Sequence, residues 1–296
     1  HLDTVNGADE QFTPRSAGGR IYGRGACDTK GSVASMLRAV CELAEAGVRP
    51  QHTEIVFAGL MDEENDQGGS RALAASGLGA NLAIVGEPTR LKIVTAHKGS
   101  LWLKLETRGK AAHGSRPELG RNAVHHMARI VDLLETSYAE HLRQRPHSLL
   151  GPPTISVGTI TGGTQPNIVP DLCAIQVDRR TLPGETVSGV QRELALMLRK
   201  SGLRARISST KPLPCMPLET DYTLPLVKQF LHCAGQRGPA GAHYFCDAAI
   251  LAAGGIPSVV FGPGDIAQAH TAEEWIAAAE VEQAKNRLVR FLRALA

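Results

Sequence analysis

The chain has little net charge, no paired-cysteine motif and no long apolar run. Its 296 residues carry a formal net charge of +3, too weak for this length to argue for nucleic-acid binding. No apolar run approaches the ~18 residues of a membrane-spanning helix, and no secretory signal peptide is visible. Internal repeats and low-complexity tracts are also lacking. These absences leave a globular protein of one large or two medium domains, without a nucleic-acid or membrane partner.

The cysteines are scattered and contain no Cys-x-x-Cys pair; they are Cys27, Cys41, Cys173, Cys215, Cys233 and Cys246. This spacing argues against a structural zinc ribbon and against a small disulfide scaffold. Reduced thiols are the ordinary interpretation, so we expect a cytoplasmic location. The chain begins with His1 rather than Met, in the middle of a motif, and we therefore expect a fragment or a processed product.

The N-terminal part alternates between helical and strand-like patterns. Residues 30–47 carry apolar side chains at helical spacing, and this helix would end at Gly47. Residues 53–60 have an uninterrupted apolar centre, which is typical of a strand in a parallel sheet covered on both faces. A helix over 68–76 and a buried strand over 82–88 follow. The repeated β-α-β order predicts a doubly wound α/β layer.

The pattern changes after residue 97. Residues 100–109 alternate apolar and polar side chains, which predicts an antiparallel strand with one wet face. The following segments predict a helix at about 120–136, strands at 154–163 and 172–181, a helix at about 185–200 and a strand near 204–210. The order β-α-β-β-α-β is that of a ferredoxin-like α+β module.

This module would be an insert at 98–212. The flanking segments, 1–97 and 213–296, would then form one discontinuous catalytic domain. A buried strand at 256–264 and an amphipathic helix from about Ala278 would complete that domain.

Acidic side chains crowd the end of the predicted strand at 53–60. Asp62, Glu63, Glu64 and Asp66 follow it within a few residues. Adjacent carboxylates repel one another and are costly to bury unless a cation lies between them. Alone, the run could be a solvated face or a helix N-terminus.

Further His, Asp and Glu side chains of the α/β part open the chain or lie at strand-like or Gly-rich segments; they are His1, Asp3, Asp28, Glu87 and His270. Four of them have an ordinary alternative: His1 on the surface, Asp28 paired with Lys30, Glu87 in a plain turn, or His270 as a helix cap. Sites in open α/β sheets form outside the carboxyl ends of the strands, so we expect these groups to meet. Mixed imidazole and carboxylate ligands suit zinc, with cobalt or manganese as alternatives.

Six motifs together resemble one family; they are HLDTV, GRGACDTKG, MDEEN, VGEPT, KAAHGSRPELGRNAV and QAHTAEEW. In this order they are similar to the co-catalytic zinc amidohydrolases that include acetylornithine deacetylase, succinyl-diaminopimelate desuccinylase, aminoacylase and glutamate carboxypeptidase. The segments GEPTRLKIVTAHKGS, DRRTLPG and FGPGDIAQAH are most similar to the acetylornithine deacetylase branch. The resemblance implies a doubly wound, zinc-exopeptidase-like catalytic domain with an inserted ferredoxin-like lid or dimerisation domain.

The resemblance also implies two divalent metal ions and assigns their ligands. His1 and Glu87 would hold one ion, Glu64 and His270 the other, and Asp28 would bridge both. These roles come from the matching motifs.

Two further carboxylates receive roles from the resemblance. Asp3 would orient the His1 imidazole. Glu63 would be the general base and acid, taking a proton from a metal-activated water and delivering it to the leaving amine. The resemblance further implies a cis peptide bond between Asp28 and Thr29.

The predicted insert supplies three residues to the implied site. His113 would stabilise the developing oxyanion, and in dimeric relatives this histidine comes from the partner subunit. Asn167 and Arg180 match substrate contacts. The alternatives are a turn histidine at position 113 and an ordinary salt bridge of Arg180 with Asp178 or Glu185.

The implied function is metal-dependent removal of the acyl group from a small N-acyl amino acid, by a homodimer joined through the insert. The alternatives are succinyl-diaminopimelate desuccinylase, a carboxypeptidase or dipeptidase on the same site, and a catalytically silent metal-binding scaffold. Glu63 argues against silence, because a scaffold needs no base beside its ligands. N-carbamoyl amidohydrolases fit less well, since they usually have Gly-x-Arg-Phe where this chain has residues 65–68. Full-length relatives have further elements before the His-x-Asp motif, whose absence would leave exposed apolar surface or a bare sheet edge.

Overall fold

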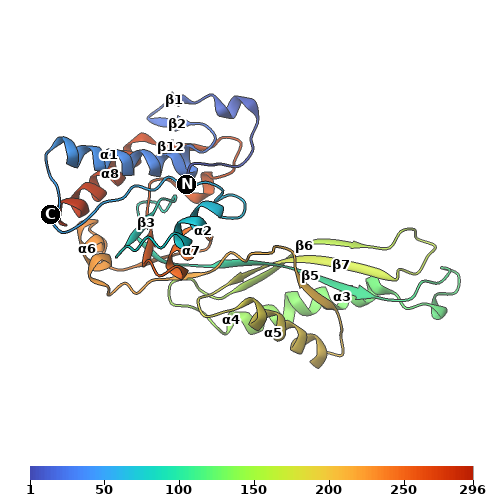
Figure 1. Ribbon diagram of the computed structural model, residues 1–296. Helices are drawn as coiled ribbons and strands as arrows, with labels where there is room; N and C mark the ends of the chain where they lie inside the picture. The colour runs from blue at the N-terminus through green and yellow to red at the C-terminus, as the bar shows by residue number, and fades with distance from the viewer. Residues whose placement is uncertain (296) are drawn as a thin grey trace. The chain divides into compact units, whose positions relative to one another are not determined.

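The computed structural model describes residues 1–295, which divide into two compact units (Figure 1). The first unit comprises residues 1–97, 218–242 and 246–295, and the second comprises residues 98–217 and 243–245. Within residues 1–295, no helix combines the length and the apolar character that a membrane crossing requires.

The main sheet of the first unit is mixed, in the order β10-β4-β11-β3, with β9 also pairing with β4. Its strands are β3 (Ala83–Val85), β4 (Val94–His97), β9 (Leu218–Glu219), β10 (Ala240–Ala242) and β11 (Ser258–Val260). The pairs β10·β4 and β11·β3 are parallel, whereas β11·β4 and β4·β9 are antiparallel. β3 and β11 confirm the strands predicted at 82–88 and 256–264.

Helices cover this sheet (Figure 1). They are α1 (Gly31–Glu45), α2 (Gly68–Ala75), α6 (Pro225–Cys233), α7 (Ala248–Ala253) and α8 (Ala278–Arg293). α1, α6 and α8 share one apolar cluster with the sheet, in which Phe230 lies 5.2 Å from Phe261 and 4.8 Å from Phe291 between ring centroids. α2 contacts α7, and α7 packs on β3 and β11. α1, α2 and α8 confirm the helices predicted from apolar spacing.

A small antiparallel sheet joins the two ends of the first unit in sequence. It has the order β1-β2-β12, from β1 (Arg15–Ala17), β2 (Arg20–Tyr22) and β12 (Trp275–Ala277). Three short helical segments lie nearby in sequence: η1 (Asp9–Phe12), η2 (Ala26–Lys30) and η5 (Ile266–Gln268). The pairing of β2 with β12 holds the segment before Asp28 beside the segment after His270.

The prediction of a strand at 53–60 is wrong. No ladder forms there, and Val56 and Phe57 are 57% and 38% exposed. β3 is the last strand of its sheet on that side, and no described strand pairs with 53–60. The apolar composition favours a strand, but an isolated extended segment gains no ladder hydrogen bonds without a neighbour.

The second unit has the predicted β-α-β-β-α-β order. Its antiparallel sheet has the order β6-β7-β5-β8, from β5 (Gly99–Arg108), β6 (Thr154–Gly162), β7 (Leu172–Thr181) and β8 (Arg206–Ser209). Its helical segments are η3 (Pro117–Leu119), α3 (Ala123–Leu133), η4 (Leu134–Tyr138), α4 (Ala139–Arg143) and α5 (Val187–Lys200). Alternate residues of β5 are buried, as the sequence pattern predicts.

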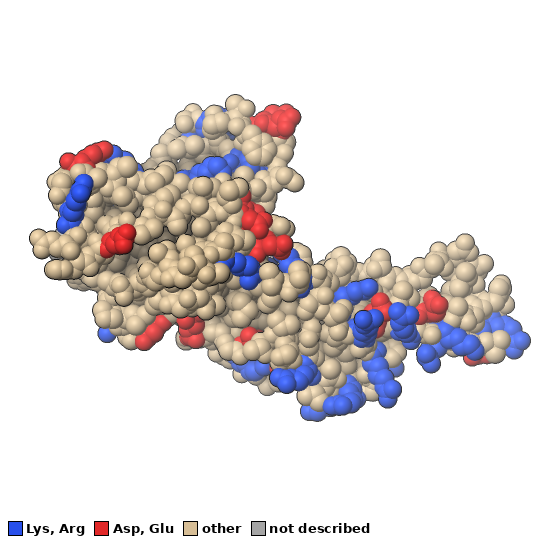
Figure 2. All heavy atoms as spheres, viewed as in Figure 1, with Lys and Arg blue, Asp and Glu red and all other residues tan. Residues whose placement is uncertain are grey.

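The helices of the second unit pack on one face of its sheet. Met127 of α3 and Leu194 of α5 join Leu103 and Ile175 of the sheet in one buried cluster. Asn122 and Thr186 cap α3 and α5, each accepting a hydrogen bond from a backbone N–H of the first turn. In Figure 2, Lys and Arg side chains gather on the visible face of this unit.

Candidate metal centre

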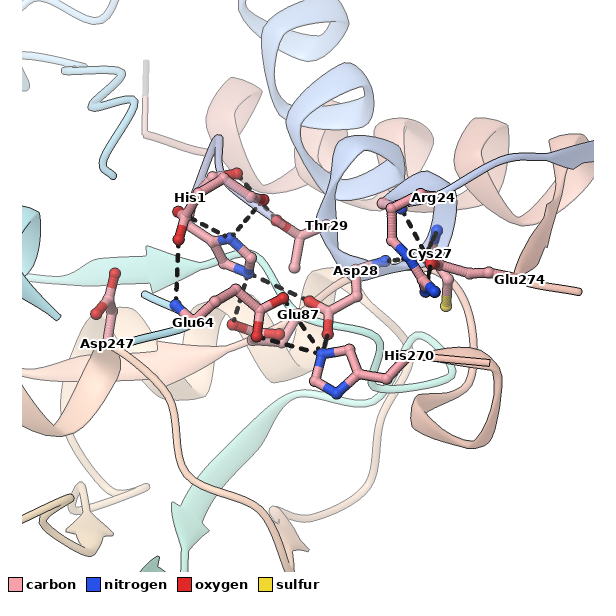
Figure 3. Close-up of polar contacts among 12 residues, drawn as sticks. His1, Arg24, Cys27, Asp28, Thr29, Glu64, Glu87, Asp247, His270 and Glu274 are labelled. Carbon is pink, nitrogen blue, oxygen red and sulfur yellow. Dashed lines mark hydrogen bonds and ion pairs between the residues drawn. The ribbon is translucent and has the colours of Figure 1, made fainter. Parts of the chain in front are cut away.

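Two histidines face the two oxygens of Asp28 (Figure 3). His1 Nε2 lies 3.2 Å from Asp28 Oδ1, and His270 Nε2 lies 3.3 Å from Asp28 Oδ2. The Asp28 side chain is only 8% exposed. One carboxylate is therefore shared between two imidazoles that are 269 positions apart in the sequence.

Each histidine also approaches a glutamate. Glu87 Oε1 lies 3.7 Å from His1 Nε2, and Glu64 Oε2 lies 3.2 Å from His270 Nε2. The structure thus brings together all five predicted ligands, as two imidazole–glutamate sets on either side of Asp28 (Figure 3).

Glu63 belongs to the same cluster. His1, Glu63 and Glu87 offer ligand atoms within 4.8 Å of one another, and so do His1, Asp28 and Glu64. Glu63 is buried, at 8% exposure. A carboxylate predicted as the base therefore lies within reach of the predicted ligands.

Local backbone conformation aims these side chains. Gly25, directly before η2, has φ 77°, in the left-handed region that favours glycine, and the peptide between Asp28 and Thr29 is cis, as predicted. Glu63 and Glu64 lie on a turn closed by a hydrogen bond of 2.6 Å from Gln67 N to Asp62 O.

The other ligand candidates lie at strand and loop ends. Glu87 follows β3, at the carboxyl end of a parallel strand. His270 follows η5 and has φ 63°, a conformation that non-glycine residues seldom adopt.

Asp3 links His1 to the turn that carries the glutamates. Its Oδ1 lies 3.4 Å from His1 Nδ1, and its Oδ2 accepts a hydrogen bond of 3.1 Å from Glu64 N. The backbone oxygen of Asp3 also lies 3.2 Å from His1 Nδ1. These contacts hold Nδ1 of the His1 ring beside Asp3 while Nε2 faces Asp28.

The histidines and Asp28 stabilise one another's charges. Burial lowers the pKa of His1, but the hydrogen bond with Asp28 and the nearby carboxylates outweigh burial and raise it to about 9. The hydrogen bond with Asp28 is the largest cause that raises the pKa of His270 to about 9. Burial acts to raise the pKa of Asp28, yet its hydrogen bonds with both histidines lower it to about 2.

The charged forms of the glutamates, in contrast, are disfavoured. Burial raises the pKa of Glu63 to about 8, and the charges of Asp247, Glu64 and Asp28 act in the same direction. Burial, followed by the charge of Asp28, also raises the pKa values of Glu87 and Glu64. The cluster therefore holds more negative charge than its own histidines neutralise.

These residues fit divalent cations. Glu87 Oε1 is buried without a hydrogen-bond partner, and buried carboxylate oxygens ordinarily have one. Imidazole nitrogens and carboxylate oxygens are ligands that zinc accepts. Cations here would replace the protons that His1 and His270 otherwise hold, because a ligand histidine must be neutral.

Two buried acids near the cluster were not predicted from the sequence. Asp247, 3% exposed, accepts a hydrogen bond of 2.7 Å from Ser70 Oγ and lies close enough to raise the pKa of Glu63. Glu274, 2% exposed, lies on the loop that follows His270. Asp247 precedes the apolar run of α7, so an acid beside a buried run was the available signal.

His113 and Asn167 lie on two adjacent loops of the second unit. Gly114 N donates a hydrogen bond of 2.7 Å to Asn167 O, and His113 forms a β-bridge with Ile168. Both side chains are exposed. His113 Nδ1 lies 2.7 Å from Ser115 Oγ, which also agrees with the alternative of a turn histidine.

Arg180 lies near the other end of β7 from these loops. Nε donates a hydrogen bond of 2.8 Å to Asp178 Oδ2, the ordinary ion pair considered from the sequence. Leu172 begins the strand on the side of Asn167, and at 3.4 Å per residue Arg180 is ~27 Å away along it. Within one chain, the second unit therefore does not bring Arg180 together with His113 and Asn167.

The sequence matches a family model and several relatives of known function. The model of peptidase family M20/M25/M40 matches residues 1–294. Acetylornithine deacetylase of Myxococcus xanthus is 33% identical over 280 residues, covering 92% of this chain and 72% of the relative. Acetylornithine deacetylase of Proteus mirabilis (strain HI4320) is 30% identical over 304 residues, covering 97% of this chain and 76% of the relative.

Solved structures agree on the fold. Aminopeptidase PepT from Bacillus cereus has a TM-score of 0.73 at 23% identity, covering 95% of this chain and 76% of that protein. A tripeptidase from Staphylococcus aureus has a TM-score of 0.76 at 19% identity, with the same coverage. These likenesses confirm the predicted fold class. With the family match over nearly every residue, they establish that this chain belongs to peptidase family M20/M25/M40, a family of metal-dependent hydrolases.

Proposed function

We propose that this chain removes the acyl group from an N-acyl amino acid, with acetylornithine as the first substrate to test. The observation that carries the proposal is the meeting of five candidate ligands, with Asp28 at their centre and Glu63 buried beside them. The two acetylornithine deacetylases described above, at 33% and 30% identity, support the choice of substrate.

His1, Asp28, Glu64, Glu87 and His270 would hold two divalent ions. Asp28 would contact both, because each of its oxygens faces a different histidine. When bound, the ions would polarise the amide carbonyl and make water a better nucleophile near neutral pH. Zinc is the metal we propose, with cobalt or manganese as alternatives.

Glu63 would carry the proton. Its buried carboxylate lies beside the predicted ligands, which supports a role as the base toward a water held there. Burial raises its pKa to about 8 in the metal-free protein. Bound cations would lower that pKa and leave the carboxylate ionised, so that it can take a proton. We infer that Glu63 takes the proton of the water and returns it to the leaving amine.

A hydrolysis assay tests this assignment. The protein, with added zinc or cobalt, is offered N-acetylornithine, N-succinyl-diaminopimelate and a simple dipeptide, and amine release is measured. We expect N-acetylornithine to be hydrolysed fastest. Glu63→Gln should lower kcat by at least ~100-fold, because the general base is lost, with bound zinc unchanged. Asp66→Asn is the matched control, since Asp66 is an exposed acid of the same run.

Other outcomes distinguish the alternatives. Faster turnover of the succinyl substrate or the dipeptide would replace the proposed substrate while keeping the mechanism. Zinc binding without hydrolysis of any of the three, equally in wild type and Glu63→Gln, would favour a silent scaffold. Equal activity of Glu63→Gln and Asp66→Asn would contradict the role of Glu63.

We propose further that His113, Asn167 and Arg180 contact the substrate in a homodimer joined through the second unit. The separation of Arg180 from the other two along β7 supports contributions from two chains. β6 is an edge strand with Ile160 55% exposed, which offers a surface for pairing. Sedimentation of the purified protein tests this, and a monomer would refute it.

A cytoplasmic location is proposed on the six free cysteines.

A further inference from the structure

Glu274 is a buried carboxylate that holds the loop leading to Asp28. Oε1 accepts hydrogen bonds from Cys27 N at 2.9 Å and Asp28 N at 3.0 Å. Oε2 accepts one from Gly25 N at 3.0 Å. Three backbone N–H groups of one short segment therefore point at a single side chain.

Arg24 balances the charge of Glu274. Its Nη1 donates a hydrogen bond of 2.9 Å to Glu274 Oε2, and both side chains are almost fully buried, at 4% and 1% exposure (Figure 3). Each carboxylate oxygen thus accepts two hydrogen bonds. A buried carboxylate with this number of donors has little freedom to move.

The same network reaches the loop of His270. Arg24 Nη2 donates to Gln11 Oε1 at 3.3 Å, and Gln11 Nε2 donates to Thr271 O at 3.1 Å and to Ala272 O at 2.9 Å. Glu274 itself lies on that loop. The segment that carries Asp28 and the segment that carries His270 are therefore joined by polar side chains as well as by the β2–β12 pairing.

We propose that Glu274, with Arg24 and Gln11, is a positioning element that sets Asp28 and His270 at the spacing needed to share a metal ion. It touches neither substrate nor metal and acts through the backbone at Asp28. A glutamate is needed at position 274, because both of its oxygens must accept hydrogen bonds. A glutamine there would turn an N–H₂ group toward one of the two pairs of donors. This inference rests on the proposed function only in taking Asp28 and His270 as metal ligands.

Metal binding tests the proposal directly. The full chain, stripped of metal, is titrated with Zn²⁺ by calorimetry, and the visible absorption of the Co²⁺-loaded protein is recorded. We expect Glu274→Gln to weaken at least one Zn²⁺ site by about 10- to 100-fold and to change the Co²⁺ spectrum, which reports ligand geometry. Glu273→Gln is the matched control: the adjacent glutamate is 80% exposed, pairs with Arg15, and should leave both readouts unchanged.

A role limited to stability would give a different result. Glu274→Gln would then lower the melting temperature of the metal-free protein but bind Zn²⁺ with wild-type affinity and an unchanged Co²⁺ spectrum, and this would overturn the proposal. If Glu274→Gln does not fold, Gln11→Ala decides, because it cuts the link to Thr271 without burying an unpaired charge. Weaker Zn²⁺ binding by Gln11→Ala supports positioning, and wild-type binding refutes it. Absence of Zn²⁺ binding by the wild type would refute the proposed function as well.

Discussion

Asp28 turns one oxygen toward each of two histidines, and the charges in this cluster determine how the native chain binds protons. His1 and His270 hold protons more tightly than free histidines because Asp28 faces both. Glu63 holds a proton more tightly than a free glutamate because it is buried among other acids. The native chain without metal should therefore bind protons that the unfolded chain releases.

This proton uptake predicts how stability depends on pH. The pKa of Glu63 rises from 4.5 to about 8 on folding, so the metal-free protein should lose stability as pH rises through that interval. The pKa values of His1 and His270 rise from 6.5 to about 9, so their contribution is complete below pH 6.5 and lost as pH rises through 9. Asp28 acts oppositely, but only below its ordinary pKa of 3.8.

Thermal melts of chelator-treated protein check this expectation. The melting temperature should be higher near pH 6 than near pH 9. Zinc-loaded protein serves as the control and should not show this fall, because the metal keeps the carboxylates ionised and the histidines neutral. A melting temperature of the chelated protein that rises or stays level over this range would contradict the assigned shifts.

The segment 53–60 illustrates what determines an element beyond its own residues. It has the composition of a buried strand, but no described strand pairs with it, and its side chains stay largely exposed. We expect its backbone amides to exchange hydrogen orders of magnitude faster than those of Val259 and Val260, which lie in a paired and buried strand. Hydrogen exchange followed by mass spectrometry measures the difference. Comparable protection of the two segments would show that 53–60 forms a ladder.

Helix α6 is predicted to depend on one aromatic side chain. Phe230 is fully buried between Phe261 and Phe291, so Phe230→Ala should lower the free energy of unfolding by ~3–5 kcal/mol. Phe12→Ala is the control, since Phe12 is 53% exposed and its loss should cost less than ~0.5 kcal/mol. Urea denaturation compares the two variants. Equal costs would mean that the cluster does not hold α6 in place.

Elements with regular apolar spacing could be predicted from the sequence, and contacts between distant backbone groups could not. The spacing of apolar residues in α8 predicted its first residue, Ala278. The alternation of apolar and polar residues predicted β5 and β7 of the second unit. The family resemblance of the motifs predicted the five candidate ligands. Glu274 was missed because its partners are backbone N–H groups some 250 positions earlier, which no side-chain pattern reveals.

At the scale of the whole molecule, each unit has a core of its own. One cluster lies between α3, α5 and the sheet of the second unit, and the other joins α1, α6 and α8 in the first. All five candidate metal ligands belong to the first unit. Removing metal should therefore weaken the first unit and leave the interior of the second unchanged.

Scanning calorimetry tests this difference. We expect two unfolding transitions, of which chelation lowers only one in temperature, and restored zinc returns it. Phe230→Ala identifies that transition as belonging to the first unit. A single transition, or equal shifts of both on chelation, would contradict independent cores.

The chain leaves the first unit at His97 and re-enters it at Leu218, and these two residues are direct partners in the pairing of β4 with β9. The two ends of the intervening 120-residue module are therefore held as close together as neighbouring strands of a hairpin. A different module joined at these two paired residues would leave the pairing of β3 with β11, which precedes Glu87, unchanged. Among the other described residues, only 243–245 group with the module.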